Sequence, residues 1–481
     1  MRVLHAAAEL YPLVKTGGLG DVTAALPAAL AAQGVDARLL LPGFPGFMRG
    51  LAGVRPLAPL PAPHWAGPAT LCEARVPESG LLAYLVDAPA LYDRPGHVYL
   101  GPDGRDWPDS HRRFALLGMA AAALAEGFDP AWAPDVVHAH DWHAALAPVY
   151  LRVAGGGAAS VLTIHNLAFQ GLFPASAFAD LDLPAMLFGL DGLEFWGRVS
   201  FLKGGLLAAD RLTTVSPTYA AEILTPEHGM GLDGVLRGRA ADLAGILNGV
   251  DYAVWDPARD PLLAAPYDAA DPAGKAACRT ALERACGWAP DPGALVLGAV
   301  TRLTEQKGFD LVLAAAESLA ALGCRLVLLG SGEADLEAGF RRLADAAPDR
   351  VWVHIGYDEA LAHRIYGGAD AMLVPSRFEP CGLTQLYAMR YGTLPVVRRT
   401  GGLADTVDDL GGRDRVPAGG TGFAFAAVEV DALLGAVARA VAARADAPRW
   451  AAARRRAMTA DFGWPRAAAH YADLYRSLRP S

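Results

Sequence analysis

The chain has 481 residues, 53% of them apolar, and 42 basic against 51 acidic residues give a formal net charge of −9. This length predicts more than one domain, the lack of a long basic run argues against a nucleic-acid partner, and no apolar stretch reaches the roughly 20 residues of a membrane-spanning helix. Five scattered cysteines without a C-x-x-C pair argue against a disulfide framework.

The chain opens on a short apolar run, Val3–Ala7, which predicts a first buried strand. It begins without the charged region and cleavage site of a signal peptide. Together with the cysteine usage, this predicts a soluble protein of the reducing cytoplasm, with no membrane partner.

A glycine-rich loop with Lys15, Gly17 and Gly18 follows the first strand, and Asp21 is expected to cap a helix that runs to about Gln33. Such a turn at a helix N-terminus lets the backbone approach a phosphate or a sugar, and Lys15 adds positive charge. Glycines in this place also serve packing alone, so the loop by itself leaves both interpretations open. A second strand is expected over residues 37–41.

Residues 42–110 are rich in proline and glycine and predict loops with a few short strands. Within them, Tyr92–Tyr99 is expected to be an exposed aromatic and polar segment. Its rings could stack on sugars or simply pack a long loop. A helix is predicted from about Arg112 to Glu126.

The next strand is expected to end at Val137, with three histidines and Asp141 just beyond it, in the string Asp135-Val-Val-His-Ala-His-Asp-Trp-His143. Imidazoles and carboxylates are good metal ligands, so the pattern could indicate a metal centre. It could equally be a sugar-binding edge, where Asp141 accepts hydroxyl hydrogen bonds and Trp142 offers a stacking face. A further strand ends in His165 and places it on the same carboxyl edge.

After a proline-punctuated connection the strand and helix alternation restarts. We predict a polar turn over residues 301–308 and a helix from Phe309 to Leu322. Predicted strands are 295–300, 325–329, 351–355, 371–374 and 395–397. The amphipathic segment from Asp461 is expected to cross back to the first domain. The chain thus predicts an α/β fold of two doubly wound domains, each with a lysine and glycine turn after its first strand.

The string Pro375-Ser-Arg-Phe-Glu-Pro-Cys-Gly-Leu-Thr-Gln-Leu-Tyr387 lies between a buried strand and a helix. Ligands bind at the carboxyl ends of strands in such sheets, and the following helix directs its N–H groups toward an anion. A single carboxylate, Glu379, beside an anion site suggests a ligand that is part phosphate and part polyol, such as a nucleotide sugar.

Six strings, in chain order, carry a resemblance to the bacterial glycogen synthase and plant starch synthase family. They are Lys15-Thr-Gly-Gly-Leu, His138-Ala-His-Asp-Trp-His143, Thr163-Ile-His-Asn166, Leu247-Asn-Gly-Val-Asp251, Arg302-Leu-Thr-Glu-Gln-Lys307 and Ser376-Arg-Phe-Glu-Pro-Cys-Gly-Leu-Thr-Gln385. The resemblance implies the GT-B fold, two Rossmann-like domains facing across a cleft, over residues 1–245 and 246–460, with a helix over about 461–481 returning to the first. It also implies transfer of glucose from ADP-glucose to the non-reducing end of an α-1,4-glucan such as glycogen, with retention of configuration and release of ADP.

The resemblance also implies residue roles. Arg302 and Lys307 would neutralise the diphosphate, Glu379 would contact the transferred glucose, and His165 and Asp141 would hold the sugar. The expected donor-side residues are Lys15, Gly17, Gly18, Asp21, Asn248, Tyr357, Cys381, Gly382, Leu383 and Thr384. We expect Tyr357 to stack on adenine, and Tyr99 and Trp142 to line the acceptor groove.

With two cations and a helix N-terminus at the diphosphate, neither a metal ion nor pyridoxal phosphate is expected. Many related retaining transferases carry a second Glu where this chain has Tyr387, which leaves the ribose contact unassigned. A glucan phosphorylase, which needs a pyridoxal phosphate lysine, and a non-catalytic nucleotide-sugar or glucan-binding protein remain alternatives. The oligomeric state and the route of retention stay open.

Overall fold

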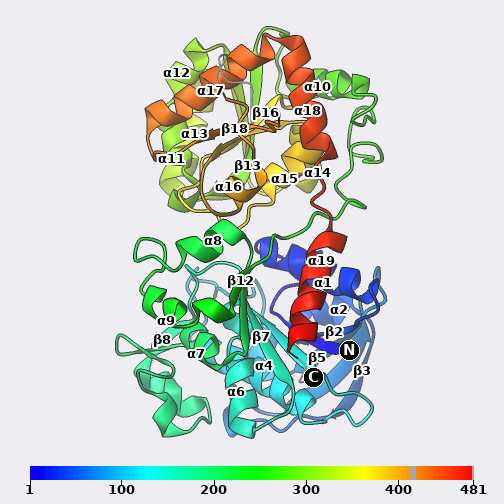
Figure 1. The fold of residues 1–481 in the computed structure, drawn as a ribbon, viewed down its shortest axis with the longest axis vertical. Coiled ribbons are helices and arrows are strands. Elements are labelled where there is room, and N and C mark those ends of the chain that lie inside the picture. Colours follow the sequence, from blue (N-terminus) through cyan, green and yellow to red (C-terminus); the bar gives the residue numbers. More distant parts are fainter. Residues whose placement is uncertain (412–418, 479–481) are drawn as a thin grey trace. The chain divides into compact units, whose positions relative to one another are not determined.

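The computed structural model describes residues 1–411 and 419–478. The chain divides into two compact units (Figure 1). The first comprises Met1–Gly249 and the C-terminal segment that begins at Trp464, and the second comprises Val250–Gly463. The boundaries inferred from sequence, after residues 245 and 460, lie a few residues earlier.

The first unit is built on a nine-stranded sheet in the order β12-β11-β7-β6-β1-β2-β5-β4-β3. The strands are β1 (Arg2–Ala6), β2 (Asp36–Pro42), β3 (Ala52–Pro59), β4 (Thr70–Arg75), β5 (Leu82–Asp87), β6 (Val136–His140), β7 (Ala159–Ile164), β11 (Arg211–Thr214) and β12 (Leu243–Gly245). All neighbours pair in parallel except β4 with β3 and with β5. The stretch 42–110 holds three strands between loops, as predicted, and these strands extend the sheet.

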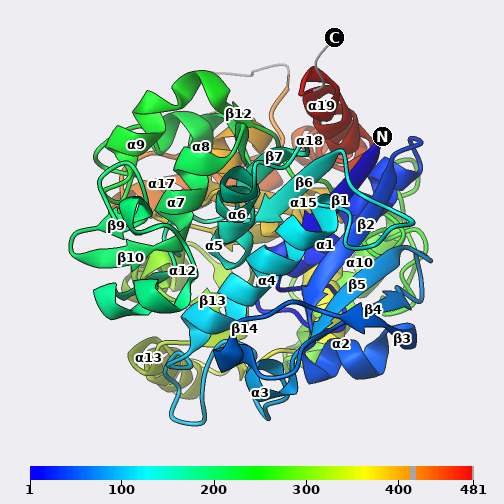
Figure 2. The ribbon, with the colours of Figure 1, turned by 90° about the horizontal axis from the view of Figure 1, so that it is seen from below.

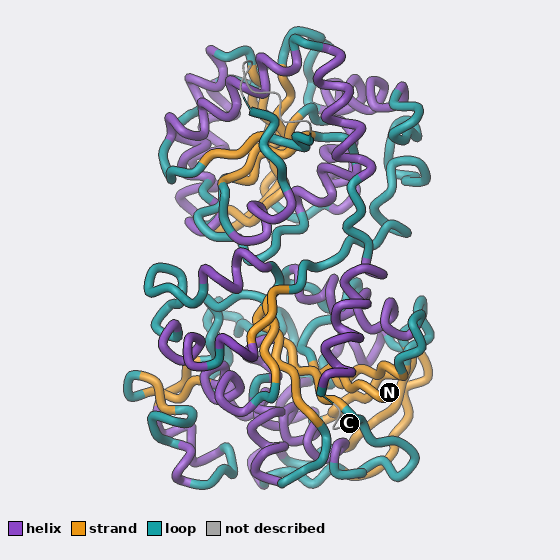
Figure 3. Tube along the Cα trace, viewed as in Figure 1, coloured by secondary structure: helices purple, strands orange, loops and turns teal. Residues whose placement is uncertain are grey.

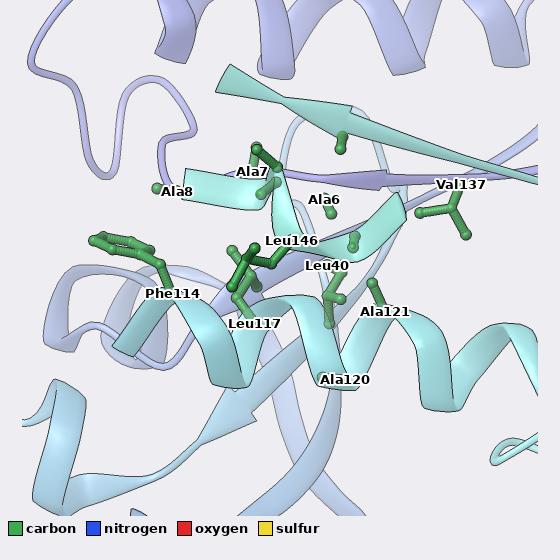
Figure 4. Close-up of a cluster of buried hydrophobic side chains, with 14 of the residues drawn as sticks. Ala6, Ala7, Ala8, Leu40, Phe114, Leu117, Ala120, Ala121, Val137 and Leu146 are labelled. Carbon is green, nitrogen blue, oxygen red and sulfur yellow. The ribbon is translucent and has the colours of Figure 1, made fainter. Parts of the chain in front are cut away.

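Successive side chains of a strand point to opposite faces of the sheet, and different helices cover each face. On one face, Leu4 and Ala6 join a core with α4 (Ser110–Ala125) and α6 (Leu146–Ala154). Figure 4 shows side chains of α4, among them Leu117, pointing toward this face, and Figure 2 shows α4 running along the sheet. On the other face, Val3 packs with α1 (Gly18–Ala31) and α19 (Trp464–Ser477).

The C-terminal helix α19 lies beside α1 (Figure 1). Its residues Tyr471 and Tyr475 are fully buried, and Gln33 Nε2 donates to the carbonyl of Pro465 at 2.8 Å. Helix α19 is therefore part of the first unit's core.

The second unit contains a six-stranded, wholly parallel sheet in the order β15-β14-β13-β16-β17-β18. Its strands are β13 (Leu295–Leu303), β14 (Cys324–Gly332), β15 (Val351–Ile355), β16 (Ala371–Val374), β17 (Leu394–Arg398) and β18 (Phe423–Phe425). In chain order this is the doubly wound order 3-2-1-4-5-6 of Rossmann folds. Helices lie on both sides of the strands (Figure 3).

One helix of this unit differs from the prediction, and the strand order of its sheet indicates where a ligand would bind. The helix expected over 309–322 is divided at Ala315 into α11 (Phe309–Ala314) and α12 (Ala316–Ala321). The strand order reverses between β13 and β16, as it does between β1 and β6 in the first unit. Such switch points are where open α/β sheets bind ligands.

All five cysteines are free and buried. Among the helices of the described residues, none combines the length and apolar character needed to cross a bilayer.

Candidate functional site

Lys307 and Glu379 meet at the switch point of the second sheet. Lys307 follows β13 in a short 3₁₀ turn, and Glu379 follows β16. The Lys307 ammonium donates to Glu379 Oε2 at 2.6 Å, and the Ser376 hydroxyl donates to the same oxygen at 2.8 Å. The Glu379 side chain is only 8% exposed and that of Lys307 is 19% exposed, so this ion pair is partly shielded from water.

The loops that carry this pair are fastened to each other. The Arg377 guanidinium forms two hydrogen bonds of 2.7 Å to the Asp310 carboxylate, and Gln306 Nε2 donates to the carbonyl of Phe378. The Arg377 guanidinium holds the pKa of Asp310 below its ordinary value. Gly308 adopts a φ of 70°, and a Cβ there would lie 2.2 Å from a carbonyl oxygen of the facing loop, so only glycine fits.

The turn after Glu379 is shaped by a buried glutamine that the sequence analysis did not single out. Gln385 Nε2 donates to the carbonyls of Cys381 and Gly382, and Gly382 has a φ of 74°. Helix α15 (Thr384–Arg390) then begins at Thr384. Leu383 occupies the preceding N-cap position, so the turn lies between strand β16 and helix α15, as expected.

Three other residues of the second unit have distinct surroundings. Arg302 is exposed near the end of β13, on the same edge as Lys307. Tyr357 follows β15, is 72% exposed, and donates its hydroxyl hydrogen bond to Glu359. Tyr387 is buried and stacks on Trp255, with ring centroids 4.0 Å apart. It is a packing residue here, and the ribose contact remains unassigned.

In the first unit, a buried glutamate organises the glycine-rich loop after β1. Glu9 Oε2 accepts hydrogen bonds from the backbone N–H groups of Thr16, at 2.8 Å, and Gly17, at 3.3 Å. The Thr16 hydroxyl donates to the other carboxylate oxygen, as does the Tyr99 hydroxyl at 2.8 Å. The loop is therefore held from inside the unit.

The predicted capping role of Asp21 is wrong. Helix α1 begins at Gly18, with Gly17 in the N-cap position, so Asp21 lies within the first turn. Its carboxylate instead accepts a hydrogen bond of 2.8 Å from the Lys15 ammonium. This ion pair places both side chains beside the glycine loop.

Asp141 stands at the end of β6 in a left-handed conformation, with a φ of 56°. Non-glycine residues in this conformation are uncommon and concentrate at functional sites. Its carboxylate accepts hydrogen bonds from the backbone N–H of His165, at 2.7 Å, and of Asn166, at 3.4 Å. Burial raises the Asp141 pKa to about 7, while these two hydrogen bonds oppose the rise. Asp141 and His165 are thus brought together, as the sequence predicted.

His138 and His140 lie within β6, not beyond its end, which corrects the predicted strand boundary. They fit inside the sheet because their ring nitrogens are hydrogen-bonded to other buried side chains. His138 contacts the hydroxyls of Tyr475 and Thr163, and His140 contacts His5 and His165. Ring nitrogens of His5, His138 and His140 lie within 4.8 Å of one another, but those of His138 and His140 are already engaged.

The prediction that Tyr92–Tyr99 is an exposed segment is partly wrong. Tyr92 is buried, and its hydroxyl donates a hydrogen bond to the carbonyl of Arg113. Tyr99 is half-buried and stacks on His143 at 4.7 Å. Trp142 is also half-buried and contacts Phe114 edge to face. Tyr99 is linked to the glycine loop through Glu9, and Trp142 directly follows Asp141 in the chain, but both rings also pack the core.

Asn248 is buried near the end of the first unit, and its Oδ1 has no hydrogen-bond partner among the described residues.

Glu9 and His5 contact site residues but were not predicted from the sequence. Glu9 carried a signal, since it is a lone carboxylate directly after a buried strand and before a glycine-rich loop. His5 carried none, because a single histidine in a strand is usual in a core.

The two units match different family models. Residues 2–238 match the family model described as the starch synthase catalytic domain, and residues 288–457 match that of glycosyl transferases group 1. The chain is 52% identical to a glycogen synthase of Variovorax paradoxus, covering 100% of this chain and 99% of that one. It is also 52% identical to a glycogen synthase of Leptothrix cholodnii, covering 99% and 100%.

Solved structures agree. The catalytic domain of starch synthase IV from Arabidopsis thaliana, bound to ADP and acarbose, superposes with a TM-score of 0.89 at 34% identity, covering 99% of each chain. A sucrose-phosphate synthase from Thermosynechococcus elongatus, 19% identical over 99% of this chain and 98% of its own, shares the fold with a TM-score of 0.59. The predicted GT-B fold of two Rossmann-like domains is confirmed. The chain belongs to the bacterial glycogen synthase and plant starch synthase family of glycosyltransferases.

Proposed function

We propose that this enzyme is a glycogen synthase that transfers glucose from ADP-glucose to the non-reducing end of an α-1,4-glucan, releasing ADP. The observation that carries the proposal is the Lys307–Glu379 pair, a cation and a carboxylate fixed together at a switch point. Similarity to glycogen synthases over the whole chain, and the ADP bound to the starch synthase IV structure, support this assignment of the substrates.

The second unit would bind the donor. Cleaving the bond between glucose and diphosphate places negative charge on the leaving oxygen, and preorganised cations and N–H groups stabilise that charge. Arg302, Lys307 and the turn from Cys381 to Thr384 supply them. The exposed ring of Tyr357, on the same sheet edge, is suited to stacking on adenine.

The first unit would serve the sugar and the acceptor. The buried Asp141 and the half-buried His165 form a polar pair, and Lys15 with Gly17 and Gly18 would present a charged, glycine-rich loop to the donor. Burial lowers the His165 pKa to about 3, so its imidazole is neutral at pH 7 and acts through hydrogen bonds, not charge.

We favour retention by same-face departure and attack, in which the leaving phosphate takes the acceptor's proton. Glu379 Oε2 already accepts hydrogen bonds from Lys307 and Ser376. These bonds lower the nucleophilicity of that oxygen, which argues against a covalent glucosyl intermediate on Glu379. The five free cysteines suit the reducing cytoplasm as the place where the enzyme works.

The test of function is incubation of the purified enzyme with glycogen and either ADP-glucose or UDP-glucose, measuring nucleotide release and glucan growth. We expect ADP release coupled to incorporation of glucose. A glucan phosphorylase would instead release glucose 1-phosphate from glycogen and phosphate and show cofactor absorbance. A non-catalytic binding protein would bind ADP-glucose without turnover.

We predict that glucan synthesis needs no metal ion and no pyridoxal phosphate. Arg302 and Lys307 would take the charge role that Mg²⁺ has at other diphosphate sites. EDTA should leave the initial rate unchanged, measured as ADP release before and after dialysis. Loss of the rate with EDTA, and its return with Mg²⁺ or Mn²⁺, would contradict this.

Trp142→Ala and Tyr99→Ala are expected to raise the KM for glycogen more than the KM for ADP-glucose, because both rings would line the acceptor groove. Tyr99→Phe is the matched control, since it keeps the ring and removes only the hydrogen bond to Glu9. Initial rates at varied glycogen and varied ADP-glucose give both constants. An unchanged KM for glycogen in both alanine variants would assign the rings to packing.

A further inference from the structure

A row of histidines runs inward from the half-buried His165 across the first unit's sheet. His165 Nε2 lies 3.0 Å from His140 Nδ1, and His140 Nε2 lies 3.1 Å from His5 Nδ1. His5 pairs with His138 in the parallel register of β1 and β6, and alternation puts His140 on the same face, beneath α19. His5 and His140 are fully buried.

Burial makes all of these imidazoles neutral. It lowers the pKa of His5 and of His165 to about 3, and that of His140 well below its ordinary value. A neutral imidazole carries one N–H and one bare nitrogen. Each contact in the row therefore holds one proton, and His140 must donate at one end and accept at the other. The proton positions along the row are coupled, and only two arrangements exist.

The inner end of the row distinguishes the two arrangements. His5 Nε2 is buried and has no hydrogen-bond partner among the described residues. In one arrangement it would carry a buried N–H without an acceptor, which is rarer in folded proteins than an acceptor without a donor. In the other, His5 Nδ1 donates to His140, and His140 Nδ1 donates to His165 Nε2. His165 then carries its own proton on Nδ1.

A second set of contacts keeps the row in place. The His138 ring lies against that of His140, with centroids 4.2 Å apart. Its two nitrogens contact Tyr475 of α19, at 2.7 Å, and Thr163 of β7, at 2.6 Å. His138 therefore supports the row by packing and does not exchange a hydrogen bond with it.

We propose that His5 and His140 are positioning residues that fix the His165 proton on Nδ1, so that this nitrogen donates a hydrogen bond to the transferred sugar. The proposal rests on the proposed function, because it takes His165 to contact the sugar. Within the described residues, no protein group is hydrogen-bonded to His165 Nδ1, which leaves it for a ligand. A sugar hydroxyl that donates its proton to a nearby carboxylate can only accept a hydrogen bond from His165. Sugar binding therefore depends on whether His165 carries its proton on Nδ1.

The test compares His5→Leu with His5→Asn. Leucine removes both ring nitrogens, whereas the asparagine amide keeps a donor near the place of Nδ1. We expect His5→Leu to lower kcat several-fold, because the His165 proton is then shared between Nδ1 and Nε2. His5→Asn should restore most of the rate. ADP affinity, measured by calorimetry, should be unchanged in both variants, because ADP has no glucose.

A readout independent of activity is the ¹⁵N NMR of histidine-labelled full-length enzyme, with the His165 signals assigned from a His165→Asn variant. We expect the Nδ1–H form in the wild type and in His5→Asn, and a mixture of the Nδ1–H and Nε2–H forms in His5→Leu, where no donor faces His140 Nε2 and the row no longer fixes the proton. An Nε2–H form in the wild type, or equal rates of the two His5 variants, would overturn the proposal even if His5→Leu proved unstable. The expected NMR result in an enzyme without glucosyl transfer would uphold the fixed proton and refute the proposed function instead.

Discussion

Lys307→Ala should lower kcat by about 10²–10³, the usual cost of losing one preorganised group that stabilises developing charge. It should also weaken ADP binding, because ADP keeps the phosphates that Lys307 would neutralise. Two unit charges about 4 Å apart attract by roughly 4 kcal/mol at an effective dielectric near 20. Lys307 retains 19% exposure, so water screens part of this, and we expect ADP affinity to fall about tenfold or more.

The measurements are initial rates with saturating glycogen and calorimetric titration with ADP. Lys307→Arg separates charge from shape, because it keeps the charge with a different geometry. Arg55→Ala is a matched control, since it removes a cation from an exposed ion pair, to Glu73 at 2.9 Å, far along the chain from these loops. Removing Lys307 also leaves Glu379 without its cation, so thermal unfolding must show that the variant is folded. Wild-type ADP affinity in a folded Lys307→Ala variant would refute its diphosphate role.

The meeting of Lys307 and Glu379 shows what sequence patterns predict well. Both residues follow short apolar runs, and parallel strands end at one edge of a sheet, so both were expected on the same edge. The pattern did not predict that β13 and β16 are adjacent. That follows from the strand order of the whole sheet, to which residues more than 100 positions apart contribute. The direct ion pair of 2.6 Å was therefore beyond the sequence analysis.

The histidines of β6 show where such reasoning fails. The hydrophobic pattern predicted that the strand ends at Val137, because histidine is polar. In the structure the strand continues through His140. The polar side chains are accepted because their partners come from β1, β7 and the distant helix α19. Glu9 is similar, since its contact to Tyr99 spans 90 positions. Buried polar groups need partners, and which residues supply them depends on the tertiary fold.

Glu379→Ala should lower kcat at least as much as Lys307→Ala while leaving ADP affinity equal to, or slightly better than, that of the wild type. Glu379 would contact the glucose, which ADP lacks, so the loss appears in the reaction and not in nucleotide binding. In the structure its carboxylate neutralises the Lys307 ammonium. Removing the carboxylate leaves that cation unpaired and raises the positive charge available to the phosphates.

Glu379→Gln is the matched variant, because it keeps the shape and one acceptor oxygen, while it removes the charge and replaces the other oxygen with an N–H donor. If charge at the sugar is what matters, the glutamine variant should be nearly as slow as the alanine variant. The turn must also survive, since the Glu379 carbonyl accepts a hydrogen bond of 3.1 Å from the N–H of Gly402, a contact that neither substitution removes. ADP titrations beside initial rates decide the matter. A loss of ADP affinity in Glu379→Ala as severe as in Lys307→Ala would mean that Glu379 organises the phosphate turn, and its role at the sugar would be withdrawn.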